Sequence, residues 1–85
     1  MSERLGFVGI LVEDRARANE AIQRILADHA ELIVARLGIP NVREQTSVIT
    51  LVVRATTDAL GRLTGKLGMV DGVQVKSALG KEKQA

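Results

Sequence analysis

The run LGFVGILVED, residues 5–14, contains the strongest structural signal in the chain. Residues 5–12 are all apolar or glycine and include several β-branched side chains, which is typical of a strand buried on both faces. The run ends in two acidic residues, and Asp14 is a good N-cap. A strand over Leu5–Val12 followed by a helix from Arg15 is therefore predicted.

The spacing of apolar residues changes after Arg15. Positions 18, 21, 22, 25, 26 and 29 recur with the period of an amphipathic helix, which we expect to end near Ala30–Glu31. Leu32–Leu37 is predicted to be a second strand. We expect a turn at Gly38–Asn41 to close it, because Pro40 cannot donate a ladder hydrogen bond. A polar hairpin loop over Val42–Thr46 then leads into a third strand, Ser47–Ala55.

The C-terminal half repeats this order without repeating the sequence. Thr56 or Thr57 is a good cap for a second helix, whose apolar stripe is formed by leucines 60, 63 and 67 and whose predicted stop is Gly68. Asp71–Gly72 is a turn signal, and Val73–Leu79 alternates as a final strand. The order βαββαβ predicts a ferredoxin-like α+β sandwich, in which a four-stranded antiparallel sheet carries two helices on one face. We expect one domain over residues 1–80 and a charged, flexible tail over 81–85.

The first and third predicted strands are apolar on both alternating faces. Helices can cover only one face of such a sheet, and a monomer would expose the other to water. We therefore expect a homodimer or a higher homo-oligomer. The alternative is that these strands are simply central and that a few exposed aliphatic side chains are tolerated.

Composition excludes several classes of function. The chain has no cysteine, one histidine and one aromatic residue, and its net charge of +2 is spread along the sequence. Disulfides are therefore excluded, and we expect no metal, no cofactor and no direct nucleic-acid binding. The apolar run near the start is too short to cross a bilayer, so a cytoplasmic protein without membrane attachment is predicted.

The segment Gly61–Leu67 resembles a phosphate-binding loop only superficially. Three residues separate its glycines instead of four, and Leu67 replaces the required Ser or Thr. Glycines 61, 65 and 68 instead lie within about 60° of one another on a helix. We expect this strip to pack closely on the sheet or on a partner subunit. The functional alternative is a small ligand on the strip, held by Thr64 and Lys66.

The remaining candidate groups have simple structural explanations. His29 is expected to be a helix-end histidine, because a metal site needs several ligands. Three arginines near the predicted hairpin, Arg36, Arg43 and Arg54, could together bind an anion. The simpler alternative is that Arg54 forms a surface ion pair with Glu31. No nucleophile with an adjacent base and no pair of carboxylates suited to acid–base chemistry is evident, so we expect no enzyme.

Five segments of the chain carry a family resemblance: Gly38–Pro40, Ser47–Val53, Thr56–Asp58, Leu63–Gly68 and Gly72–Ala78. Through them most of the chain, from about Arg4 to Leu79, resembles the family of iron-only hydrogenase system regulators. The resemblance implies an ACT-like version of the ferredoxin fold and a non-enzymatic regulatory role. The histidine and cysteine ligands of the nickel-responsive regulator, a protein of related shape, have no counterparts here.

The resemblance also implies where a ligand would bind. ACT-like domains commonly bind small molecules at a subunit interface, near the turn between the first strand and the first helix. A protein–protein interaction module without a ligand is the main alternative, and a small enzyme of this fold is a third. The candidate ligand-binding residues are Glu13, Asp14, Arg15, Gly38, Ile39, Pro40, Asn41, Gly61, Thr64 and Gly65.

Overall fold

The computed structural model describes residues 2–81 as a two-layer α+β domain. The rest of the predicted tail, residues 82–85, lies outside the described residues. The elements are β1 (Arg4–Val12), α1 (Arg15–Asp28), a 3-10 turn (Ala30–Leu32), β2 (Ile33–Arg43), β3 (Thr46–Ala55), α2 (Thr57–Gly68) and β4 (Val73–Leu79).

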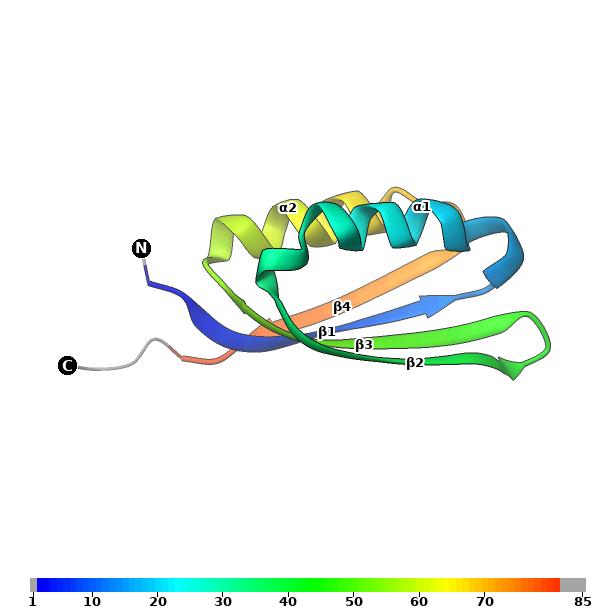
Figure 1. Cartoon of the computed structure of the whole chain (residues 1–85), viewed down its shortest axis with the longest axis horizontal. Coiled ribbons are helices and arrows are strands. Elements are labelled where there is room, and N and C mark those ends of the chain that lie inside the picture. The colour runs from blue at the N-terminus through cyan, green and yellow to red at the C-terminus, as the bar shows by residue number, and fades with distance from the viewer. Residues whose placement is uncertain (1, 82–85) are drawn as a thin grey trace.

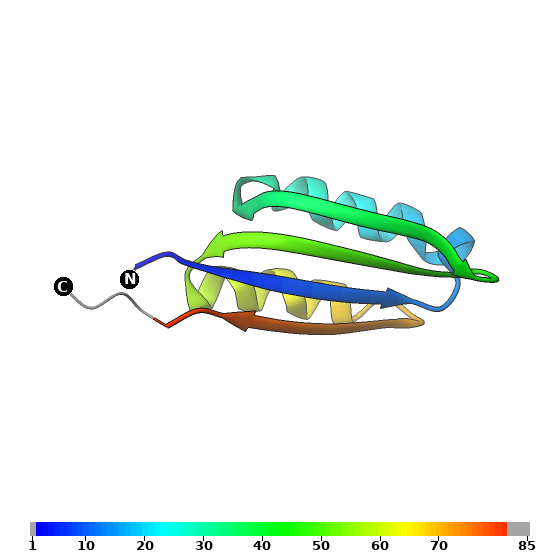
Figure 2. The same ribbon diagram turned by 90° about the horizontal axis from the view of Figure 1, so that it is seen from below.

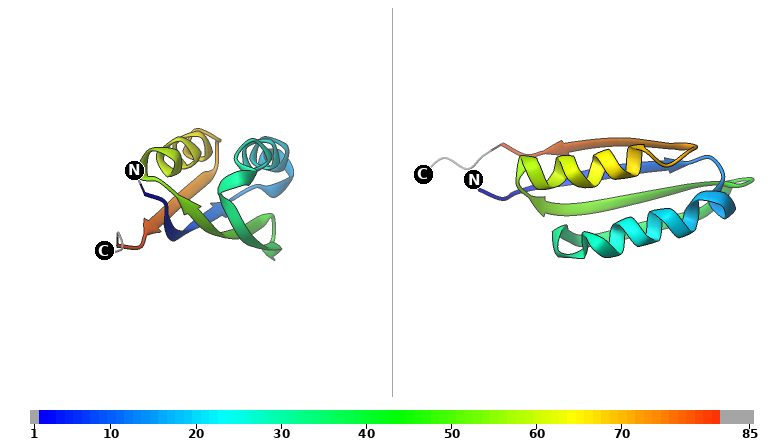
Figure 3. Two further views of the ribbon diagram at one scale, coloured as in Figure 1. Left: turned by 60° about the vertical axis from the view of Figure 1, so that its left-hand side comes forward. Right: turned by 90° about the horizontal axis from the view of Figure 1, so that it is seen from above.

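The four strands form one antiparallel sheet in the order β2-β3-β1-β4. Both helices lie on the same face, side by side (Figures 1 and 3). The opposite face is left uncovered, as the view from below shows (Figure 2). This topology confirms the predicted ferredoxin-like fold.

The core lies between the helices and one face of the central strands. Val8, Ile10 and Val12 of β1 point toward the helices, as do Leu51 and Val53 of β3, and all five are at most 1% exposed. They meet the apolar stripes of the helices, so alternation along the strands separates a dry face from an open one. The helical part of the core consists of Ala18, Ile22, Leu26, Leu60, Leu63 and Leu67.

Both predicted helix caps are present. The Asp14 side chain accepts from the Arg17 amide, and the Thr56 hydroxyl accepts from the Ala59 amide. His29 lies at the C-terminal end of α1, with its Nδ1 atom 2.9 Å from the Ile25 carbonyl oxygen. These contacts satisfy helix-terminal groups that would otherwise have no partner.

The turn predicted at Gly38–Asn41 is wrong, because β2 continues through it to Arg43. β2 is an edge strand, so the missing N–H of Pro40 removes no necessary ladder bond. The register instead shifts between Ile39 and Arg43, which marks a bulge. The chain reverses at residues 44–45, where Glu44 has a positive φ of 55°.

The expectation that the α2 glycines pack on the sheet is also wrong. A Cβ added at Gly61, Gly65 or Gly68 would meet nothing within 4 Å. The leucine stripe of α2 faces the core, and the glycine strip faces away from it. Gly68 is the last helical residue, as predicted, and the next residue, Met69, keeps right-handed backbone angles.

Gly6, by contrast, stands where β1 and β4 come closest. A Cβ at this position would clash with the Ala78 carbonyl oxygen and lie 2.8 Å from the Leu79 side chain. A backbone carbonyl cannot move aside without disturbing the ladder between β1 and β4. Glycine at position 6 is therefore required by the packing of the sheet.

We expect Gly6→Ala to destabilise the protein by about 1–3 kcal/mol, the usual cost of overpacking. Thermal unfolding followed by circular dichroism measures this. The matched control is Gly38→Ala, whose added Cβ would meet only the Ile49 side chain at 4.0 Å. The control should unfold at or slightly above the wild-type temperature, and equal losses in the two variants would contradict the steric explanation.

We expect Gly65→Ala to stabilise the protein by about 1 kcal/mol, the difference in helix propensity between the two residues. Chemical denaturation measures the change. Gly72→Ala is the comparison, because Gly72 has a φ of +75° and alanine there should cost about 1–2 kcal/mol. A loss of stability in Gly65→Ala would show that the strip is not open to solvent.

Candidate functional site

A pocket of about 210 Å³ opens between α1 and the β2–β3 hairpin. It lies where the hairpin runs alongside the first turns of the helix, on the helix-covered side of the sheet. Its walls come from three elements, α1, β2 and β3. The lining residues are Arg15, Asn19, Gln23, Arg36, Gly38, Ile39, Pro40, Ser47, Val48 and Ile49.

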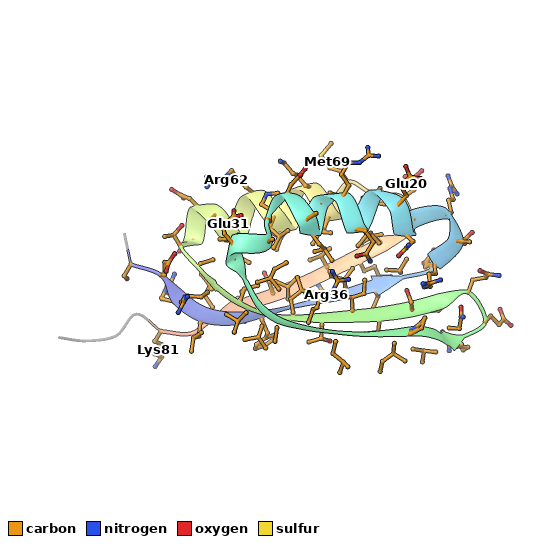
Figure 4. The ribbon with its side chains drawn as sticks, in the orientation of Figure 1. Glu20, Glu31, Arg36, Arg62, Met69 and Lys81 are labelled. Atoms are coloured by element: carbon orange, nitrogen blue, oxygen red, sulfur yellow. The ribbon has the colours of Figure 1, made fainter. Side chains whose placement is uncertain are left out.

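One wall of the pocket is a chain of polar side chains. The Arg36 guanidinium donates to Gln23 Oε1 at 2.9 Å, and the Gln23 amide donates to Asn19 Oδ1 at 3.3 Å. Arg36 lies in the space between α1 and β2 (Figure 4). The bond to Gln23 therefore ties the edge strand to the helix and orients the guanidinium along the pocket.

The lining carries positive charge without any compensating carboxylate. Arg15 and Arg36 contribute two guanidinium groups, and none of the ten lining residues is acidic. Within residues 2–81, the ion pairs use other arginines: Arg17 with Asp71, Arg24 with Glu20, and Arg54 with Glu3. The pocket thus has a local charge that favours anions.

The floor of the pocket is formed by small residues of the hairpin. Gly38 has no side chain, and a Cβ there would touch only Ile49. Ser47 is 4% exposed, so its hydroxyl is among the few buried polar groups of the domain. The absence of bulk at Gly38 keeps the space beside Arg36 open.

The structure brings together only some of the residues predicted from the sequence. Arg15, Gly38, Ile39 and Pro40 line the pocket, whereas Asn41 does not. Asn41 has a positive φ of 54° and lies in the bulged end of β2.

Glu13 and Asp14 lie beside the pocket but serve the fold. The Glu13 amide donates to the Gly72 carbonyl, and the Asp14 side chain caps α1. The first contact holds the β1–α1 turn against the α2–β4 turn, and the second stabilises the start of α1.

The candidate residues of α2 do not reach this pocket. Gly61 and Gly65 face open space, and the Thr64 hydroxyl donates to the Leu60 carbonyl within its own helix. The predicted strip is therefore separate from the site around Arg15.

Sequence reasoning missed Asn19, Gln23 and Ser47, and did not assign Arg36 to this site. Arg15, Asn19 and Gln23 are spaced four residues apart, which places them on one helix face. That spacing was the available signal for a polar stripe beside Arg15. Ser47 carried no such signal, because its burial depends on the hairpin crossing the start of α1.

The proposed convergence of the three arginines is wrong. Arg36 pairs with Leu51 in the ladder and points to the helix side, whereas Arg54 pairs with Leu5 on the open side. The expected ion pair of Arg54 with Glu31 is wrong for the same reason, because Glu31 lies in the 3-10 turn on the helix side. Arg54 instead lies 3.8 Å from Glu3.

The open face of the sheet is the second candidate surface. Cross-strand register places large side chains in two rows, Val52–Phe7 and Ile39–Val48–Leu11. Between them lies a row that is low at its centre, where Thr50 pairs with Gly9, and that has Leu37 and Lys76 at its two ends. The large apolar side chains that are 42–64% exposed on this face are Leu5, Phe7, Leu11, Leu37, Ile39 and Val52.

Two further searches of the described residues bear on the site. Residues 2–81 contain no group of three or more His, Cys, Asp or Glu side chains placed to hold a metal ion. Neither helix in this part of the chain is long and apolar enough to cross a membrane.

Comparisons of structure show the fold and its relatives. The chain is similar to the uncharacterized protein TM1266 from Thermotoga maritima, with 37% identity and a TM-score of 0.87 over 93% of this chain and 99% of that one. It is similar in fold to the ACT domain of the GTP pyrophosphokinase of Chlorobium tepidum, with 23% identity and a TM-score of 0.76 over 91% and 100% of the two chains.

The same fold also occurs in an enzyme. SnoaB, a cofactor-independent oxygenase from Streptomyces nogalater, has 16% identity and a TM-score of 0.58 over 100% of this chain and 97% of that one. Fold alone therefore does not distinguish a regulator from a catalyst.

Sequence comparison identifies the family. No curated protein is significantly similar to this chain. A family model described as "TM1266-like: Iron-only hydrogenase system regulator, putative" matches residues 4–77. With this match over nearly the whole domain and the ACT-like fold, the chain belongs to the TM1266-like family of iron-only hydrogenase system regulators.

Proposed function

We propose that this chain is a non-enzymatic regulatory module that works as a homo-oligomer and binds a small ligand. The family description supports the regulatory role, and the ACT-like fold supports the sensing of a small molecule. The observation that carries the assembly is the apolar open face of the sheet. A second copy of this chain is its proposed occupant.

The energy of covering this face favours association. Half-burying its six large exposed side chains contributes about 5–9 kcal/mol per copy, at about 1.5–3 kcal/mol for a fully buried side chain. A symmetric dimer doubles this contribution. The total of about 10–18 kcal/mol exceeds the lower and middle part of the association cost, which is about 4–15 kcal/mol.

The relief of the face favours a second copy as the occupant. Two rows of large side chains flank the low centre formed by Gly9 and Thr50, beyond which Leu37 and Lys76 stand at the ends of the row. A two-fold axis lets a row of one copy enter the low centre of the other, since an isologous interface uses the same surface twice. Phe7 of one copy then packs over Gly9 of its partner. Polar and basic residues at the edges, Arg54, Gln74 and Lys76, form a rim.

A second candidate function is favoured by the exposure of β2. This edge strand is exposed from Val34 to Arg43, and Val34, Leu37, Ile39 and Val42 are apolar. An edge strand can pair with an extended segment of another protein. In that case the chain is a docking module without a ligand, and the purified protein stays monomeric.

We expect light scattering at tens of micromolar to give a multiple of the 9.1 kDa chain mass. Phe7→Asp should weaken the assembly about a hundredfold or more, because it removes a large buried side chain and places a charge in the interface. The matched control is Met69→Asp. Met69 is 85% exposed and lies on the helix side, far from the open face (Figure 4), so its change should leave the mass unchanged.

The Gly9→Leu variant distinguishes association through a shape-complementary interface from non-specific hydrophobic association. An added Cβ there would meet only the Lys76 carbonyl at 3.9 Å, so the monomer can accept it. The variant makes the face more apolar but fills the low centre, and we expect weaker association. A wild-type protein that stays at 9.1 kDa, or a Gly9→Leu variant that associates more tightly, would contradict the proposed interface.

A further inference from the structure

We propose that the pocket between α1 and the β2–β3 hairpin binds a small oxyanion, a metabolite that presents a carboxylate or a phosphate to Arg15 and Arg36. This inference deepens the proposed function, on which it rests, by naming the site and the ligand class. It uses a surface different from the open face of the sheet, so the two proposals can fail separately.

The positive charge of the pocket favours an anionic ligand. Two guanidinium groups from different elements line one pocket of about 210 Å³, and no acidic residue is among its lining residues. The three ion pairs of residues 2–81 use neither Arg15 nor Arg36. Guanidinium groups match the planar, bidentate geometry of carboxylates and phosphates, so both arginines are suited to an oxyanion.

Three of the four amides over residues 15–18, at the start of α1, are already bonded within the protein. The Arg15 amide donates to the Gln45 carbonyl at 2.9 Å, and the Arg17 amide donates to the Asp14 side chain. The Ala18 amide donates to the Asp14 carbonyl. With these donors occupied, recognition falls to the side chains, and the hairpin is held beside the helix by the bond from Arg15 to Gln45.

The arginine of the edge strand is held in place before a ligand arrives. Gln23 accepts from the Arg36 guanidinium at 2.9 Å and itself donates to Asn19. A guanidinium has five donors, so this bond leaves others for the ligand. The hydroxyl of Ser47, a buried residue in the floor of the pocket, is a further hydrogen-bond donor.

Size and lining restrict the rest of the ligand. A volume of about 210 Å³ corresponds to roughly seven water molecules at about 30 Å³ each, which is below the usual size of a drug pocket. Pro40 and Ile49 add an apolar side to the polar wall. The expected ligand is therefore a small acid or phosphate ester with a short aliphatic portion.

The test uses inorganic phosphate and succinate as separate probes of the full-length protein. Each is titrated calorimetrically at constant ionic strength set with sodium chloride, and amide shifts are followed by NMR. We expect saturable binding of at least one probe at one site per chain, with the largest shifts at Gly38 and Ser47. Binding of phosphate alone indicates a phosphorylated ligand, and binding of succinate alone indicates a carboxylic acid.

Three variants make the result specific. Arg36→Gln should weaken binding about tenfold or more, because it removes a charge-assisted hydrogen bond. Gly38→Val keeps both guanidinium groups but fills the space beside them, and should also abolish saturation. Arg24→Gln is the control, because it removes the same positive charge outside the pocket. Arg24 pairs with Glu20 on the solvent side of α1. It should bind as the wild type does.

Two results would overturn the inference: no saturable binding of either probe, or equal weakening in Arg36→Gln and Arg24→Gln. The second would mean that overall charge, not the pocket, attracts the anion. Light scattering of the same samples separates this proposal from the proposed assembly. A protein that assembles but binds neither probe refutes only the pocket, and a monomer that binds refutes only the assembly.

Discussion

The pairing of β1 with β3 is the interaction on which the rest of the molecule depends. The two strands are central in the sheet, and each is apolar on both of its faces. One set of side chains, including Ile10 and Leu51, is completely covered by the helices. The other set remains exposed, so the strand pair that builds the core also creates the apolar outer surface.

The same strand order explains the polar pocket. β2 occupies an edge, and α1 lies alongside it without sealing the hairpin end. The inward positions of β2 carry Arg36 and Gly38 rather than large apolar residues. Polar side chains of α1, Asn19 and Gln23, lie opposite these two residues. This end of the space between the helices and the sheet is therefore polar and charged instead of apolar. The open face and the pocket thus lie on opposite sides of one sheet.

Much of the architecture could be predicted because its signals are local. The caps at Asp14 and Thr56, the turn at Gly72 and the alternation in β4 each depend on a few neighbouring residues. The end of β2 could not be predicted in this way. Proline usually ends a strand, and only the edge position, a non-local property, makes Pro40 acceptable inside one.

The sequence by itself determined the order of the elements and showed that the two central strands are apolar on both faces, but it did not decide which face the helices cover. It also identified Arg15 and Gly38–Pro40 as candidates. Only the tertiary structure decided that these residues share a pocket with Asn19, Gln23, Arg36 and Ser47, and that the α2 glycines face away from it. The physical reason is that the spacing of apolar residues and helix capping depend on a few neighbouring residues. Which part of the hairpin lies beside which turn of α1 depends instead on strand register across the whole sheet.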